Sequence, residues 1–229
     1  MTETRDPDDD ERGGSPPCFL HELGPPGAPV DVQQARDVAR WRKSERSRLI
    51  ALRCALSAED RARQTAAIAR KLDEMLSARS NEIVSAYWPI RAEPDLRLWM
   101  RAASLRGLCV ALPVAVALGQ PMTFREWRPG SPMARGLWGI PYPAGGREVS
   151  PTTVIAPLVG FDSACYRLGY GGGFFDRTLA TMACKPMAIG VGYPQLRIST
   201  IFPQCHDIPM DWIVTGEEPP LRRTPDAVV

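Results

Sequence analysis

The chain has 229 residues and a formal net charge of +2. This length suffices for one α/β domain with a substantial core, and so small a charge gives no broad electrostatic argument for binding nucleic acid or a membrane. The six cysteines form no C-x-x-C pair, and no apolar run reaches the twenty or so residues of a membrane span. We therefore expect a cytoplasmic protein with reduced thiols and no nucleic-acid or membrane partner.

The first forty residues differ in composition from the rest. Residues 6–11 form an acidic run, and prolines and glycines recur between residues 16 and 29. Such a composition does not support regular structure. We expect a disordered extension over residues 1–40, followed by one folded domain over residues 41–229.

A helical apolar period begins at Trp41, where three leucines share one face while three arginines project charge elsewhere. The leucines are Leu49, Leu52 and Leu56, and the arginines are Arg42, Arg46 and Arg53. Ser57 and Asp60 then provide the hydroxyl and the acid of a variant capping box. They predict the start of a second helix, which extends to Leu76.

Beyond this helix, segments with the period of strands alternate with segments that have the period of helices. Strands are predicted at residues 82–88, 108–112, 122–127, 154–159, 187–192 and, last, 212–215. Helices are predicted at residues 95–105 and 174–183, and residues 130–146 are expected to be mostly loop. The alternation predicts a single α/β domain with an open, mainly parallel sheet and helices on both faces. Ligands bind such sheets beyond the carboxyl ends of the strands.

The most informative segment is Arg167-Leu168-Gly169-Tyr170-Gly171-Gly172-Gly173-Phe174-Phe175-Asp176-Arg177. Four glycines in five residues bring bare N–H groups close to a ligand, and a helix N-terminus behind them completes an anion cradle. Arg167 adds a positive charge and Asp176 a hard oxygen ligand, which suits a magnesium-bound polyphosphate. The segment lacks the lysine of a P-loop and the third glycine of a dinucleotide fingerprint. The alternative is a surface turn in which Arg167 and Asp176 only pair with each other.

This segment, with Phe161-Asp162 ahead of it, resembles the signature of the 5-formyltetrahydrofolate cyclo-ligase family. Three other segments agree in order and spacing: residues 42–46, residues 87–93 and residues 206–215. The resemblance extends from about Trp41 to about Glu217. It implies a monomeric catalytic domain that converts 5-formyltetrahydrofolate to 5,10-methenyltetrahydrofolate. ATP is the co-substrate and Mg²⁺ the cofactor; ADP and phosphate are released, through a phosphorylated formyl intermediate.

The resemblance also implies roles for individual residues, with Arg167 as the catalytic group that neutralises the transferred phosphate. The implied ATP contacts are Arg42 or Lys43, Arg46, Arg167, Leu168, Gly169, Tyr170, Gly171, Gly172, Gly173, Phe174 and Phe175. The implied substrate contacts are Trp88, Glu93, Tyr170, Gly171, Gly172, Gly173 and Phe174. The implied magnesium ligands are Asp176 and Asp211.

Structural alternatives stay open for several of these positions. The basic residues 42–46 could form an exposed helix face, and Trp88 could belong to the core. Glu93 could cap the helix expected to start at Asp95. Asp207 is a competing candidate for the metal.

Two departures from the family pattern bear on the chemistry. Many members carry lysine where Gly172 stands, and tyrosine at Phe174 or Phe175. Without that ammonium, Arg167, Arg46, the loop backbone and Mg²⁺ would have to neutralise the transferred phosphate. The departures keep open a second hypothesis, a non-catalytic family member that binds reduced folate or nucleotide.

Overall fold

The computed structural model describes residues 32–77 and 82–224, and its centre is a seven-stranded sheet. The strands are β1 (Ile83–Ser85), β2 (Cys109–Val114), β3 (Thr123–Glu126), β6 (Thr153–Pro157), β9 (Met187–Gly192), β10 (Trp212–Thr215) and β11 (Leu221–Arg222). Their order is β11-β10-β9-β6-β1-β2-β3. The five inner strands are parallel, whereas β3 and β11 pair antiparallel at the two edges. The predicted mainly parallel open sheet is confirmed.

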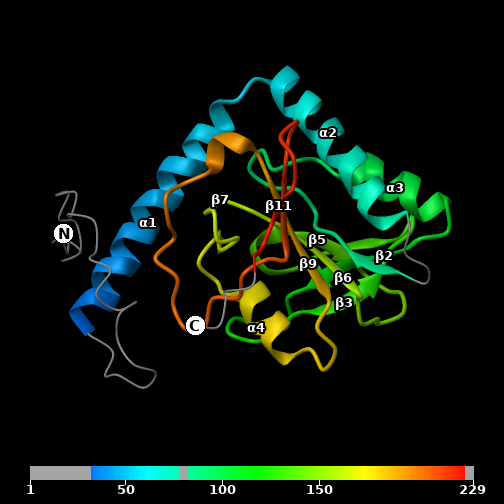
Figure 1. Cartoon of the computed structure of the whole chain (residues 1–229). Coiled ribbons are helices and arrows are strands. Elements are labelled where there is room, and N and C mark those ends of the chain that lie inside the picture. Colours follow the sequence, from blue (N-terminus) through cyan, green and yellow to red (C-terminus); the bar gives the residue numbers. More distant parts are fainter. Residues whose placement is uncertain (1–31, 78–81, 225–229) are drawn as a thin grey trace, which may run out of the picture.

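Four α-helices accompany the sheet in the described part of the chain (Figure 1). They are α1 (Val32–Ala55), α2 (Ala58–Leu76), α3 (Arg97–Leu105) and α4 (Phe174–Thr181). The capping signal before α2 is confirmed, since Ser57 Oγ accepts the Asp60 N–H at 3.0 Å. No helix in residues 32–77 or 82–224 combines the length and the apolar character needed to cross a bilayer.

Both faces of the sheet are covered, as the sequence predicts. Successive residues of a strand point to opposite faces, so Ile155 of β6 packs with α2 and α3, while Val154 and Ala156 pack on the other side. On that second side, Leu49 of α1 and Leu179 of α4 join the buried cluster. The near-continuous apolar strands are typical of a parallel sheet that is buried on both faces.

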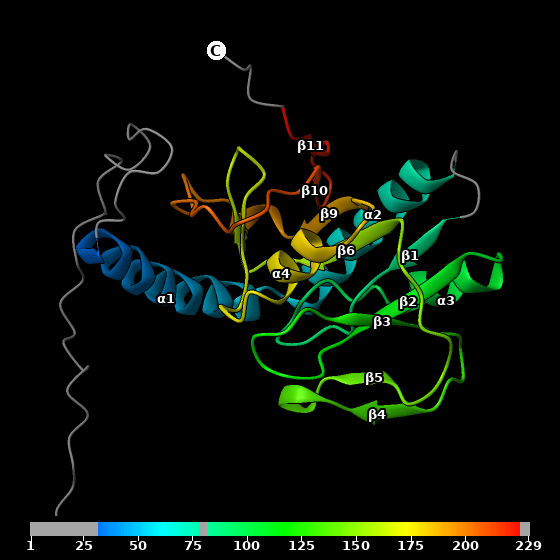
Figure 2. The ribbon, with the colours of Figure 1, turned by 90° about the horizontal axis from the view of Figure 1, so that it is seen from below.

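Two short hairpins lie outside the main sheet, and the periodicity analysis predicted neither. The first joins β4 (Met133–Arg135) to β5 (Pro141–Pro143), inside a segment expected to be mostly loop (Figure 2). The second joins β7 (Gly160–Phe161) to β8 (Arg167–Leu168), so a hairpin separates β6 from the glycine-rich segment. Strands of two or three residues are too short to show a period of two. The final strand β11 was missed for the same reason, and β1 ends at Ser85 rather than at residue 88.

The first helix differs from the prediction in two respects. It begins at Val32 rather than Trp41, so residues 32–40 are helical and not part of a disordered extension, while residues 1–31 lie outside the described range. Its buried residues are Val38, Arg42, Leu49 and Arg53. The predicted leucine face is therefore wrong at Leu52, which is 37% exposed, and Arg42 and Arg53 point inward. Residues separated by four, seven and eleven positions share a helix face, and long arginine stems can line apolar surface.

Candidate active site

A left-handed backbone shapes the glycine loop, residues 169–173, between β8 and α4. Gly171 has φ of 92° and Gly173, the N-cap of α4, has φ of 62°. Side chains rarely adopt these angles, so the loop depends on glycine at both positions. The loop leads directly into the N-terminus of α4, as an anion cradle requires.

Arg46 of α1 lies against this loop, where the resemblance places a nucleotide contact. Its Nε donates to the Gly169 carbonyl at 2.7 Å, and a Cβ at Gly171 would lie 3.3 Å from its Cζ. Burial, and then the neighbouring charge of Arg42, lowers the pKa of Arg46. Lys43 is exposed on the same helix. The structure thus brings a half-buried guanidinium to the candidate phosphate site.

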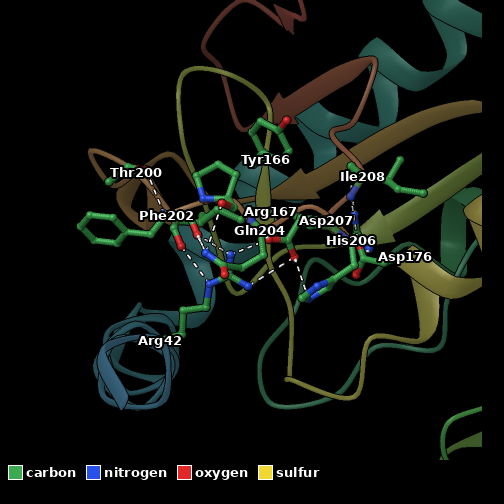
Figure 3. Close-up of polar contacts among 12 residues, drawn as sticks. Arg42, Tyr166, Arg167, Asp176, Thr200, Phe202, Gln204, His206, Asp207 and Ile208 are labelled. Carbon is green, nitrogen blue, oxygen red and sulfur yellow. Dashed lines mark hydrogen bonds and ion pairs between the residues drawn. The ribbon is translucent and has the colours of Figure 1, made fainter. Parts of the chain in front are cut away.

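Arg42 instead reaches the segment after β9, as Figure 3 shows. Its Nε donates to the Ile201 carbonyl at 2.9 Å and its Nη2 to the Phe202 carbonyl at 2.8 Å. The Asp207 carboxylate pairs with Nη2 at 2.5 Å, and both side chains are about one-tenth exposed. Because these donors are engaged, Arg42 braces residues 201–207, and Asp207, the competing metal candidate, serves as its partner.

Arg167 and Asp176 form a largely buried ion pair. The distance from Nη2 to Oδ2 is 2.8 Å, and the two side chains are 4% and 20% exposed. The backbone of Ile208 bonds to both, since its carbonyl accepts from Arg167 and its N–H donates to Asp176 (Figure 3). Burial lowers the pKa of Arg167, although Asp176 acts in the opposite direction. The pairing foreseen as the structural alternative is therefore present.

The second proposed metal ligand, Asp211, precedes β10. Its Oδ2 accepts the Ala188 N–H at 2.8 Å, so it also contacts the start of β9. Within residues 32–77 and 82–224, no three His, Cys, Asp or Glu side chains gather as a metal cage. Magnesium seldom needs such a cage, because it binds through one or two carboxylates with phosphate oxygens and waters. Carboxylates such as Asp176 and Asp211 suit an ion that arrives with a nucleotide, but their contacts here are separate, Asp176 with Arg167 and Ile208 and Asp211 with Ala188, so the magnesium pair stays a prediction.

Glu93 is buried between the loop that follows β1 and the glycine loop. Its Oε2 accepts the Ile90 N–H at 2.9 Å, and its Oε1 accepts the Tyr170 hydroxyl at 2.8 Å. Burial raises the pKa of Glu93 above its usual 4.5. The capping alternative is wrong, because Asp95 Oδ1, not Glu93, accepts the Arg97 N–H at the start of α3.

Arg53 completes this cluster, although no sequence motif marks it as a site residue. Its side chain is fully buried and donates to the carbonyls of Arg91 and Leu158 and to the Tyr170 hydroxyl, at 2.9, 3.0 and 2.6 Å. Burial, followed by the charge of Glu93, raises the pKa of Tyr170. The available signal was the spacing from Arg42 and Leu49, which puts Arg53 on their helix face.

Aromatic side chains border the loop on its other side. Phe174 packs edge-on against Trp138 of the β4–β5 hairpin, with ring centroids 5.5 Å apart. Arg177 lies over the Phe174 ring, and Arg167 lies over Phe175. Trp138 was also missed; it is 67% exposed and has φ of 55°, an unusual combination for a tryptophan.

Trp88 is half-buried and packs against the core cluster on the α2 and α3 side, beneath the Arg97 guanidinium. Its role as an apolar wall for the pterin beside Glu93 stays a prediction.

The fold and the site define an α/β protein in which a basic glycine loop lies beside a buried glutamate. A model of the 5-formyltetrahydrofolate cyclo-ligase family matches residues 38–216. The chain therefore belongs to the 5-formyltetrahydrofolate cyclo-ligase family, as the sequence resemblance predicted.

Individual relatives agree with this assignment. A 5-formyltetrahydrofolate cyclo-ligase of Mycolicibacterium smegmatis is 30% identical over 144 residues, 59% of this chain and 74% of the relative. One from Haemophilus influenzae is 24% identical over 182 residues, 76% of this chain and 97% of the relative.

Solved structures show the same fold. The 5,10-methenyltetrahydrofolate synthetase of Aquifex aeolicus has a TM-score of 0.70 at 26% identity, covering 82% of this chain and 95% of that one. The corresponding Mycoplasma pneumoniae protein has a TM-score of 0.64 at 20% identity, covering 77% of this chain and 99% of its own. The expectation of an enzyme of this class is confirmed.

Proposed function

We propose that this protein uses ATP and Mg²⁺ to convert 5-formyltetrahydrofolate to 5,10-methenyltetrahydrofolate, releasing ADP and phosphate. The observation that carries the proposal is the contact between the two halves of the site. The glycine loop, with Arg46 beside it, is joined to the buried Glu93 through the Tyr170 hydroxyl. A phosphate site and a pterin site in contact are what direct transfer between two bound substrates requires.

The proposed reaction begins when the formyl oxygen of the folate attacks the γ-phosphorus of ATP in line. The bond from that phosphorus to the β,γ-bridging oxygen breaks, ADP leaves, and an N-formyl phosphate forms. The folate N10 then adds to the activated carbon and loses its proton. Expulsion of phosphate gives the methenyl product. No side-chain nucleophile is required, because such transfers depend on positioning and charge stabilisation.

The chain's own groups have distinct tasks in this scheme. The loop N–H groups, Arg46 and Arg167 would bind the phosphates, and of the alternatives Arg42 and Lys43 the exposed Lys43 is the better candidate for a further contact. Magnesium would supply additional charge neutralisation, with Asp176 and Asp211 as its proposed ligands. Glu93 would accept hydrogen bonds from the pterin N–H groups. Monomeric state and cytoplasmic location stay predictions.

The second hypothesis is a family member that binds reduced folate or nucleotide without turnover. The presence of Arg167, Asp176 and Asp211 favours the enzyme, since a pterin-binding protein would not need a pair of carboxylates for a metal. The absorbance rise of methenyltetrahydrofolate, measured with and without ATP and Mg²⁺, separates the two. Folate binding with no product under complete conditions would favour the binding protein.

Two variants test the metal and phosphate assignments within the same assay. Asp176→Asn keeps an oxygen for the Ile208 N–H but removes the anion, so the Mg²⁺ concentration needed for half-maximal turnover should rise. Arg167→Ala should instead weaken ATP binding at saturating Mg²⁺, because a charge-assisted hydrogen bond contributes about 1.5–3 kcal/mol. An unchanged Mg²⁺ titration in Asp176→Asn would contradict its role as a ligand.

A further inference from the structure

The glutamate proposed to bind folate is closed off in this structure. Its side chain is 1% exposed, and each of its oxygens accepts a hydrogen bond from within the protein. The Tyr170 hydroxyl occupies Oε1, while its ring extends toward solvent, so that the residue is 39% exposed. The guanidinium groups of Arg53 and Arg91 lie 5.8 and 5.7 Å from the ring centroid. Tyr170 thus covers Glu93 from the glycine loop.

Arg53 connects this cover to the rest of the site. The Arg53 Nε donates a hydrogen bond to the carbonyl of Arg91, which lies in the tight turn immediately before Glu93. Arg91 and Ala92 both have left-handed φ, 45° and 59°, which residues other than glycine keep only where the surroundings fix them. The other two nitrogens donate to the Leu158 carbonyl, immediately after β6, and to the Tyr170 hydroxyl, and Nη1 also lies 3.9 Å from Glu93 Oε1 as a buried ion pair. Three separate segments therefore meet at one buried cation.

We propose that Arg53 is a positioning residue which, through the Tyr170 hydroxyl, couples Glu93 to the glycine loop, so that folate and nucleotide bind with positive cooperativity. This inference deepens the proposed function and rests on it. Neither Arg53 nor its coupling role follows from the sequence motifs, which involve only the segments on either side of it.

Access to one oxygen gives the coupling its direction. Because the Glu93 side chain is 1% exposed and the Tyr170 hydroxyl lies against Oε1, a pterin N–H can reach that oxygen only if Tyr170 moves. Tyr170 lies between Gly169 and Gly171, so we expect its movement to reorient the adjoining loop N–H groups. Direct transfer requires both substrates together, and the complex holding both must have the released loop. A ligand that favours one state of such an equilibrium raises the affinity of any other ligand that favours it.

The test measures folate affinity in the presence and absence of a non-hydrolysable magnesium–ATP analogue. In the wild type we expect the analogue to tighten 5-formyltetrahydrofolate binding by about fivefold or more. Tyr170→Phe keeps the ring but cannot donate a hydrogen bond to Glu93, so it should bind folate alone more tightly than the wild type. The coupling factor, which is the folate Kd without the analogue divided by the folate Kd with it, should then fall toward one. Tyr142→Phe, which removes a phenol hydroxyl from β5 outside this network, should behave as the wild type.

Arg53→Lys gives an independent reading, because lysine keeps the charge but cannot reach three segments with a planar fork. We expect it to lose coupling as Tyr170→Phe does. Coupling retained in Tyr170→Phe, or independent binding in a wild type that turns over, would overturn the inference and leave the proposed function intact. A wild type that binds no folate would overturn both.

Discussion

The two arginines on α1 at positions 42 and 46 should fail in different ways when their charge is removed. Arg42→Met breaks a pair with Asp207 in which both side chains are about one-tenth exposed, and frees two carbonyls. Removing one partner of a buried pair costs about 3–5 kcal/mol, and the lower value applies because Asp207 keeps the Gln204 N–H. At about 2–4 °C per kcal/mol for a domain of this size, Tm should fall by about 6–12 °C.

Arg46→Met is the matched control. It loses one hydrogen bond, to the Gly169 carbonyl, which is worth about 1 kcal/mol or about 2–4 °C in Tm. If Arg46 contacts phosphate, its loss should raise the KM for ATP by at least about tenfold, since the contact is worth about 1.5–3 kcal/mol.

The assay pairs thermal unfolding with initial rates across ATP concentration, at saturating folate and Mg²⁺. We expect lower thermal stability in Arg42→Met and a higher KM for ATP in Arg46→Met. The reverse pattern, with Arg42→Met melting as the wild type while its KM for ATP rises, would refute the brace and make Arg42 a nucleotide contact.

Two further predictions concern the folate side and the loop. Burial raises the pKa of Glu93, so its neutral form persists to higher pH than usual, and folate affinity should fall as the pH is lowered through that raised pKa. Glu93→Gln should bind folate weakly at every pH. A wild-type pH profile of folate binding in that variant would exclude Glu93 as a folate contact. Gly172→Ala would place a Cβ 2.9 Å from the Phe174 ring, whereas a Cβ at Gly169 meets nothing within 4 Å. Gly172→Ala should lower Tm by about 2–4 °C, for a cost of about 1 kcal/mol, whereas Gly169→Ala should leave Tm unchanged. Equal melting temperatures for the two variants would show that the Phe174 ring moves freely.

The parts of this protein that follow from sequence are those with local or family-specific signals. The apolar period of the inner strands predicts the sheet, and Ser57 with Asp60 predicts the start of α2. The glycine loop carries the family signature. Arg46 lies against that loop, and its contact with the nucleotide stays a prediction. The substrate, metal and nucleotide contacts themselves remain proposals.

The parts that do not follow depend on partners far away in the chain. Arg53 bonds to residues 105 and 117 positions later, and nothing near it in sequence distinguishes an inward arginine from an outward one. Helical periodicity favoured Leu52, yet the sheet and the loops supplied carbonyls for Arg42 and Arg53 instead. Trp138 belongs to a hairpin whose strands have three residues each, which is too short for a strand period to be recognised in the sequence.

The contacts of α1 also have a consequence for synthesis on the ribosome. This helix is made early, yet the acceptors of Arg42 at Ile201 and Phe202 follow 159 and 160 residues later. Until those residues emerge, the Arg42 guanidinium must remain hydrated and its part of the inward helix face uncovered, whereas the acceptors of Arg53 at Arg91, Leu158 and Tyr170 are made earlier. A chain that stops before about residue 200 would leave that face open, which is the kind of exposed surface that chaperones bind and proteases recognise. Closure of the nucleotide side of the site therefore waits for the synthesis of residues 201–207.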